Sequence, residues 1–315
     1  MTAPRAVCIG ECMVELSRGS DGRFGLAYGG DTFNTAVYLA RAGVTTTYAT
    51  ALGDDPYSAG ILALAAAEGV GTDLVLVHPG RMPGLYLIET TPQGERTFHY
   101  WRDRSPAREL LDRADAEHIL GTIANARLVY LSGITLSLYS ASALDRLAAG
   151  LVQARKNGAM IAMDGNYRPR GWGGDTDRAR AVFERFWRLA DIALPTFDDE
   201  AMLWGDSQTA TTIARLEGFG VPEIALKLGP EGALIATRRN QPVAVPVPSP
   251  IQAIDTTAAG DSFNAAYLSA RLAGHTSSEA ALAGHHLAGI VICHRGAIAP
   301  REATAVALRD LEHPG

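Results

Sequence analysis

The chain has 315 residues, of which 47% are hydrophobic and 20% are charged, as is usual for a globular protein. Its net charge of −6 argues against a nucleic-acid-binding surface, and no apolar run approaches the roughly 20 residues that span a bilayer. Three cysteines are too few for a disulfide framework and no signal-peptide pattern opens the chain, so a reduced, cytoplasmic protein is expected.

In chain order, the first elements alternate between strand and helix patterns. The apolar run "AVCIGECMVEL" (6–16) predicts a strand, and "TFNTAVYLARAG" (32–43) predicts a helix that ends at Gly43. The run "TTTYATALG" (45–53) predicts the next strand. It is followed by "DDPYSAGILALAAAEG" (54–69), a helical pattern whose acidic start suits a helix N-terminus.

The same alternation continues through the rest of the chain. Four short apolar runs predict strands: "ARLVYLSG" (126–133), "AMIAMDGN" (159–166), "DIALPT" (191–196) and "EIALKLG" (223–229). Three stretches predict helices: "SALDRLAAGLVQARKNG" (142–158), "DRARAVFERFWRLA" (177–190) and "FNAAYLSARLAG" (263–274). The pattern predicts an α/β fold with a doubly wound, mostly parallel sheet flanked by helices, and residues 1–315 as a single domain.

Two segments break the alternation. Residues 83–104 predict an antiparallel hairpin with its turn at "TPQGE" (91–95), and "SRGSDGRFGLAYGG" (17–30) predicts an irregular insert after the first strand. Ligands of open α/β sheets bind at the carboxyl edge of the strands. We therefore expect segments of roughly 13–30 and 83–104 to form a small β lid over that edge.

The stretch "DTTAAGDSF" (255–263) places an acid behind very small residues at the start of a helix. Small residues let backbone amides approach a ligand, and the helix N-terminus attracts an anion. Asp261 in that turn is a candidate general base for a hydroxyl group. From the residues alone, an acidic helix cap with small residues for packing is an equally open interpretation.

This stretch resembles the D-T-x-G-A-G-D signature of the ribokinase-like (PfkB) sugar kinases. Four further stretches occur in family order: "GGDTFNTAVYLARAG", "LGDDPYSAG", "KLGPEGAL" and "HHLAGIVICHRGAIAP". The resemblance implies a ribokinase-like fold, with Asp261 as the catalytic base and the amides of Ala258, Ala259 and Gly260 as an anion hole. Ala258 stands where Gly is commonest, and "DTTAAGD" is similar to the form in 2-keto-3-deoxygluconate kinases.

The resemblance also implies ATP, with its Mg²⁺, on the C-terminal half of the chain. The implied nucleotide-binding residues are Asn166, Arg168, Thr196, Lys227, Gly229, Gly232, Ala258, Gly260 and His285. The family's N-x-x-E motif is altered at Thr196 and Asp199, so Asp199 is expected to reach the metal only through water. Three interpretations remain open: that His285 lies on a helix surface, that "KLGPEGA" is an ordinary turn, and that Asp255 is either a structural cap or a K⁺ ligand.

The implied sugar-binding residues are Gly30, Asp31, Asn34, Tyr86, Tyr100, Arg102, Arg168 and Asp261. A guanidinium matches a carboxylate, so Arg102 and Arg168 indicate a sugar acid rather than a neutral sugar. Two alternatives stay open, namely that Arg102 is a solvated member of the charged run "RDRSPARE" and that Asn34 caps or packs its helix.

The expected activity is ATP-dependent phosphorylation of 2-keto-3-deoxygluconate at its 6-hydroxyl group. Alternatives are a family kinase acting on fructose, ribose or 5-dehydro-2-deoxygluconate, or a non-catalytic sugar sensor. A dinucleotide-dependent dehydrogenase is excluded, because "IGECMVEL" stands where G-x-G-x-x-G is needed. The expected partners are the sugar acid and ATP, with no nucleic acid or membrane, and a homo-oligomer formed through the lid.

Overall fold

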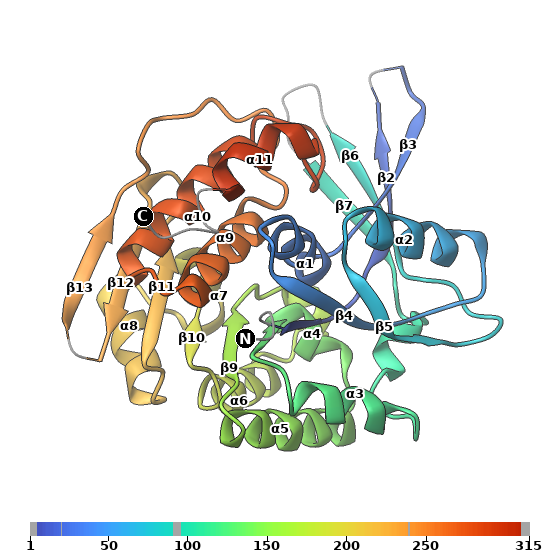
Figure 1. Ribbon diagram of the computed structural model, residues 1–315, viewed down its shortest axis with the longest axis horizontal. Coiled ribbons are helices and arrows are strands. Elements are labelled where there is room, and N and C mark those ends of the chain that lie inside the picture. The colour runs from blue at the N-terminus through green and yellow to red at the C-terminus, as the bar shows by residue number, and fades with distance from the viewer. Residues whose placement is uncertain (1–4, 20, 91–95, 239, 310–315) are drawn as a thin grey trace.

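The computed structural model of the chain describes residues 5–19, 21–90, 96–238 and 240–309 (Figure 1). The strands are β1 Arg5–Ile9, β2 Met13–Arg18, β3 Phe24–Gly29, β4 Thr45–Leu52, β5 Gly71–Val77, β6 Leu85–Thr90, β7 Arg96–Trp101, β8 Leu128–Ser132, β9 Met160–Asp164, β10 Ile192–Ala193, β11 Glu223–Lys227, β12 Ala233–Thr237 and β13 Asn240–Val245. The helices are α1 Asp31–Arg41, α2 Pro56–Ala67, α3 Ala116–Ile123, α4 Gly133–Leu138, α5 Ala141–Lys156, α6 Thr176–Trp187, α7 Phe197–Trp204, α8 Thr209–Gly218, α9 Ala259–Ala273, α10 Ser277–Val291 and α11 Arg301–Arg309.

Within these residues, nine strands form one sheet in the order β13-β12-β11-β10-β9-β8-β1-β4-β5. The pairs from β5 to β11 are parallel, whereas β12 and β13 are antiparallel additions at one edge. The predicted doubly wound, mostly parallel sheet is therefore confirmed. The strand order reverses beside β1, since β4 and β5 lie on one side of it and β8 to β11 on the other.

Helices cover both faces of this sheet (Figure 1). Residues of β8 alternate between two apolar cores, because successive side chains of a strand point to opposite faces. Tyr130 joins Phe33 of α1 and Leu268 of α9 in one core. Val129 joins Leu147 of α5 in the other. The buried sheet between two helical layers explains why its strands appear in the sequence as continuous apolar runs.

The structure corrects the first predicted strand. Residues 6–16 form two strands in different sheets, with β1 in the main sheet and β2 in a second sheet of order β3-β2-β6-β7. The chain turns at Gly10, where a Cβ atom would lie 2.1 Å from Oγ1 of Thr32. The apolar pattern runs unbroken through this turn, so periodicity alone does not reveal it.

The second sheet lies beside the main one, at the upper right of Figure 1. The predicted hairpin is confirmed by the antiparallel pairing of β6 and β7, although its predicted turn at 91–95 lies outside the described residues. The predicted irregular insert instead contains β3, which pairs antiparallel with β2. We call these four strands the lid sheet.

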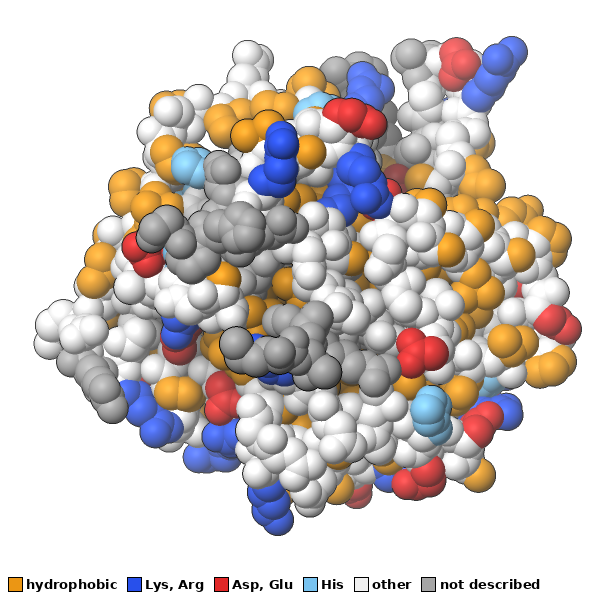
Figure 2. All heavy atoms as spheres, viewed as in Figure 1, with side chains coloured by type: hydrophobic (Ala, Val, Ile, Leu, Met, Phe, Trp, Pro, Cys, Tyr) orange, Lys and Arg blue, Asp and Glu red, His pale blue; other side chains and the backbone are white. Residues whose placement is uncertain are grey.

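No helix in the described part of the chain is both long and apolar enough to cross a membrane. Acidic and basic side chains are interspersed on the face shown in Figure 2.

Candidate active site

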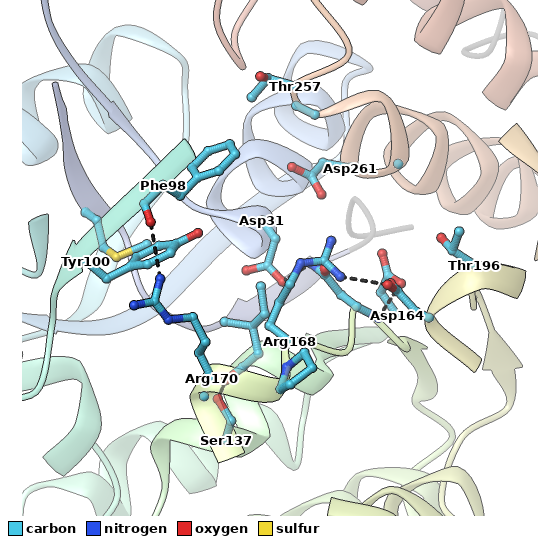
Figure 3. Close-up of a pocket in the computed structure, with 18 of the residues that line it drawn as sticks. Asp31, Phe98, Tyr100, Ser137, Asp164, Arg168, Arg170, Thr196, Thr257 and Asp261 are labelled. Atoms are coloured by element: carbon cyan, nitrogen blue, oxygen red, sulfur yellow. Dashed lines mark hydrogen bonds and ion pairs between the residues drawn. The ribbon is translucent and has the colours of Figure 1, made fainter. Parts of the chain in front are cut away.

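A cavity of about 1540 Å³ lies at the carboxyl edge of the main sheet, between the lid sheet and the start of α9 (Figure 3). This is the edge where ligands of open α/β sheets bind. Twelve of the predicted site residues line it: Asp31, Tyr100, Arg102, Asn166, Arg168, Thr196, Asp199, Lys227, Ala258, Ala259, Gly260 and Asp261. Residues far apart in the sequence are thus brought to one place.

Asp261 lies in the first turn of α9 and is only 9% exposed. Asn34 donates a hydrogen bond of 2.8 Å from Nδ2 to Oδ2 of Asp261, which fixes the carboxylate. Burial, followed by the nearby charge of Asp31, raises the pKa of Asp261 to about 8. A carboxyl group with a pKa close to the operating pH is suited to accept a proton from a hydroxyl group.

The residues before Asp261 form a positively polarised turn. Ala258 is in the left-handed conformation, with φ of 60°, which is strained for any residue with a Cβ atom and explains why glycine is the commoner residue at this position. The first amides of a helix have no acceptor within it and attract anions. The amide of Ala259 donates to the carbonyl oxygen of Thr256 at 3.2 Å, so the turn is partly closed on itself. A Cβ atom built on Gly260 lies 3.5 Å from Nζ of Lys227, which places an ammonium beside the turn.

Sequence reasoning missed the buried carboxylate that holds this lysine. Nζ of Lys227 donates to Oδ2 of Asp164 at 3.0 Å and to Oδ1 of Asn264 at 3.1 Å. Nδ2 of Asn264 donates in turn to Oδ2 of Asp164 at 2.6 Å. Asp164 ends a buried strand at the ligand edge, and this position was the signal that could have identified it.

Two arginines of the cavity wall, Arg102 and Arg168, pair with acidic side chains. Arg102 pairs with Oε2 of Glu11, a residue that is 3% exposed, so the interpretation of Arg102 as a solvated residue is wrong. Nη1 of Arg168 donates to Oδ1 of Asp199 at 2.8 Å. Both guanidinium groups therefore face the cavity while already neutralised by an acid.

Six predicted residues lie outside the cavity wall: Gly30, Asn34, Tyr86, Gly229, Gly232 and His285. Asn34 contacts Asp261, and the hydroxyl of Tyr86 donates to Glu15. His285 is buried, with Nε2 2.9 Å from the carbonyl oxygen of Val245, so its interpretation as a helix-surface histidine is wrong. Its imidazole is engaged with the backbone rather than directed into the cavity.

Asp255 contacts backbone amides. Its Oδ1 accepts from the amide of Thr257 at 2.8 Å and its Oδ2 from that of Gly296 at 2.9 Å, as expected for a structural cap. Among the described residues, no group of three or more His, Cys, Asp or Glu side chains is arranged to hold a metal ion.

A carboxylate poised beside a positively polarised helix end suits the transfer of a phosphoryl group to a hydroxyl, the chemistry of small-molecule kinases. The chain belongs to the pfkB family of carbohydrate kinases, whose model matches residues 3–304.

One sequence relative and two solved structures are similar to this chain. The chain is 43% identical to a 2-dehydro-3-deoxygluconokinase of Escherichia coli (strain K12), over 94% of this chain and 97% of that protein. Its fold matches the crystal structure of 2-dehydro-3-deoxygluconokinase from Thermotoga maritima with a TM-score of 0.81 at 23% identity, covering 96% of this chain and 99% of the other. It also matches a fructokinase with bound ATP from Xylella fastidiosa, with a TM-score of 0.82 at 19% identity and coverage of 98% and 97%.

Proposed function

We propose that the protein transfers a phosphoryl group from ATP to the 6-hydroxyl of 2-keto-3-deoxygluconate, a sugar acid also called 2-dehydro-3-deoxygluconate. The observation that carries the substrate is that several arginines, among them Arg102, Arg168 and Arg170, line the cavity that contains Asp261. A neutral sugar needs no guanidinium group, whereas the forked donors of a guanidinium match the two oxygens of a carboxylate. The 43% identity to the E. coli 2-dehydro-3-deoxygluconokinase supports the same substrate.

In the proposed reaction, Asp261 takes the proton of the sugar hydroxyl as its oxygen bonds to the γ-phosphorus. The bond from that phosphorus to the bridging oxygen of ADP breaks, and ADP leaves. Lys227 and the amides of Ala258 and Gly260 stabilise the charge on the transferring group, since preorganised donors supply most of the catalysis in phosphoryl transfer.

The remaining residues bind and orient the two substrates. Asp31 and Tyr100 contact sugar hydroxyl groups in this proposal, and Asn34 acts through Asp261 because it contacts that carboxylate. Gly30 and Tyr86 support the sugar site from outside the cavity wall. Asn166, Thr196 and Arg168 face the nucleotide.

Mg²⁺ would accompany ATP, and Asp199, whose Oδ1 already accepts a hydrogen bond from Arg168, would contact it through water. The protein residues therefore orient the metal through the nucleotide. We assign Asp255 a structural role rather than K⁺ binding, since both of its oxygens accept backbone amides.

The pH dependence follows from the environment of Asp261. Burial and the charges of Asp31 and Asp164 raise the pKa of this carboxyl group to about 8. The hydrogen bond from Asn34 and the charge of Lys227 oppose the rise. Protonated Asp261 accepts no proton, so kcat/KM rises with pH up to about 8 and then levels. In Asn34→Leu the hydrogen bond that lowers the pKa of Asp261 is lost, so the rise of kcat/KM shifts to higher pH. A profile that is flat between about pH 6 and 9 contradicts the assignment of the base.

The lid sheet supplies a surface for a second copy of the chain. Phe24 and Leu26 on β3 are 47% and 53% exposed, and Trp101 on β7, the opposite edge strand, is 61% exposed. Exposed apolar side chains of this kind favour an interface. We expect a dimer by light scattering, and monomers from the double variant Leu26→Asp, Trp101→Asp. A monomeric wild-type chain contradicts this proposal.

The function is tested by measuring ADP release with Mg-ATP and five sugars. The panel contains 2-keto-3-deoxygluconate, 2-keto-3-deoxygalactonate, 5-dehydro-2-deoxygluconate, fructose and ribose. We expect kcat/KM for the ketodeoxygluconate to exceed that for the neutral sugars by at least about 100-fold, because a neutral sugar makes no charge-assisted hydrogen bonds with the arginines of the cavity. A preference for fructose or ribose contradicts the sugar-acid proposal and leaves the family intact. No release with any sugar, while ATP still binds, favours the sensor.

A further inference from the structure

Arg170 is the feature of the cavity that the proposed function does not yet use. It belongs to the 3₁₀ helix Pro169–Trp172, and its side chain extends toward Phe98 and Tyr100 of β7 (Figure 3). Nη1 of Arg170 donates to the carbonyl oxygen of Phe98 at 3.3 Å. Arg170 thus lies between the main body and the lid sheet, on the cavity wall.

Arg170 differs in its partners from Arg102 and Arg168, two of the four other arginines on the cavity wall. Arg102 pairs with Glu11 and Arg168 with Asp199, so each carries its own counter-charge. Among the described residues, Arg170 pairs with no acidic side chain, and its one hydrogen-bond acceptor is a neutral carbonyl. A sugar acid brings a negative charge into this space. If every guanidinium were neutralised, that charge would have no compensation, and its desolvation would oppose binding.

The backbone holds Arg170 in place. Trp172 two residues later is only 2% exposed, and Pro169 restricts the backbone before it. A Cβ atom on Gly171 would lie 2.7 Å from Oγ of Ser137, which shows how closely the turn packs on α4. Burial raises the pKa of Tyr100, and the charges of Arg102, Arg168 and Arg170 together oppose this shift, so all three act on the space around that hydroxyl.

From these contacts we infer that Arg170 is the residue that selects a sugar acid over a neutral sugar, by pairing with the carboxylate of the substrate. The inference rests on the proposed function and deepens it. Arg102 and Arg168, already paired, orient the sugar and the nucleotide through hydrogen bonds, while Arg170, which acts on Tyr100 and bonds to Phe98 of the lid sheet, provides a charge that no acid among the described residues compensates there. Its bond to the carbonyl oxygen of Phe98 is weak enough to exchange for a charge-assisted bond to a carboxylate.

The test compares 2-keto-3-deoxygluconate with 3-deoxyfructose, which differs only by a CH₂OH group in place of the carboxylate. Arg170→Gln lowers kcat/KM for the acid by about 10- to 100-fold, as expected for loss of a charge-assisted hydrogen bond. The same variant changes kcat/KM for 3-deoxyfructose and the KM for ATP by less than about threefold. Arg170→Lys recovers part of the activity with the acid, since it retains the charge but not the fork.

Arg108 supplies the matched control, because it also lines the cavity and has no acidic partner among the described residues. Arg108→Gln leaves the preference for the acid unchanged. Equal losses on both substrates in Arg170→Gln, no loss at all, or the same change of preference in Arg108→Gln each overturn the inference. Failure of the wild-type protein to phosphorylate the ketodeoxygluconate is a separate result, which contradicts the proposed function instead.

Discussion

Asp261→Asn is expected to lower kcat by about 10²- to 10⁴-fold, the contribution of a positioned general base. Asparagine keeps the size of the side chain but accepts no proton from a sugar hydroxyl. The acceptor for Nδ2 of Asn34 survives as the amide oxygen, so the helix start should fold as before. Rapid-quench measurement of ADP formation gives the rate of the chemical step directly.

Binding measurements separate catalysis from affinity in this variant. Titration calorimetry is expected to give Kd values for Mg-ATP and the sugar acid within about fivefold of the wild type, or tighter for the nucleotide, because a raised pKa already leaves Asp261 largely neutral at pH 7. Turnover near the wild-type level in Asp261→Asn contradicts its role as base. Loss of binding for both substrates points to a structural role.

The second large effect is expected at Lys227. Lys227→Met removes the ammonium beside the anion-binding turn, and we expect kcat to fall by about 10²- to 10³-fold, as for the loss of one donor to a developing charge. The single variant also leaves Asp164 buried without its cation. That uncompensated charge costs about 3–5 kcal/mol of folding free energy, so a lower Tm is expected as well.

A double variant distinguishes these two consequences. In Lys227→Met with Asp164→Asn the buried charge is removed, and the amide that replaces the carboxylate still bonds to Asn264, so the Tm recovers most of the loss. Turnover stays low, because the ammonium is still absent. If the double variant regains both stability and turnover, Lys227 has only a structural role, and the proposed anion site is wrong.

The order of strands and helices could be predicted from the sequence because buried parallel strands appear as continuous apolar runs between amphipathic helices. The same signal failed at residues 6–16. The end of β1 and the start of β2 are both apolar, and the crossing between two sheets depends on the close approach of Gly10 to Thr32. Such a contact lies 22 residues away in the sequence, by the difference of the two residue numbers, and leaves no local pattern.

The sequence predicted those site residues that belong to a motif or whose side-chain chemistry suits the reaction, but not how the side chains pair. Asp261 and the small residues before it stand out because few other turns combine them, and the structure brings them to the cavity. The pairing of Arg102 with Glu11 and of Lys227 with Asp164 could not be predicted, since each joins side chains from separate strands or loops. The burial of His285 could not be predicted either, because its imidazole contacts the carbonyl oxygen of Val245, which lies 40 positions away in the sequence.

The most direct test of the central claim is the phosphorus NMR spectrum, without proton decoupling, of the product formed from Mg-ATP and 2-keto-3-deoxygluconate. A phosphate ester on the 6-hydroxyl couples to the two protons of C6 and gives a triplet, together with stoichiometric ADP. That triplet is the result our account predicts. A doublet, which marks a phosphorylated secondary hydroxyl, or the absence of any new ester while the ATP remains intact, would contradict it.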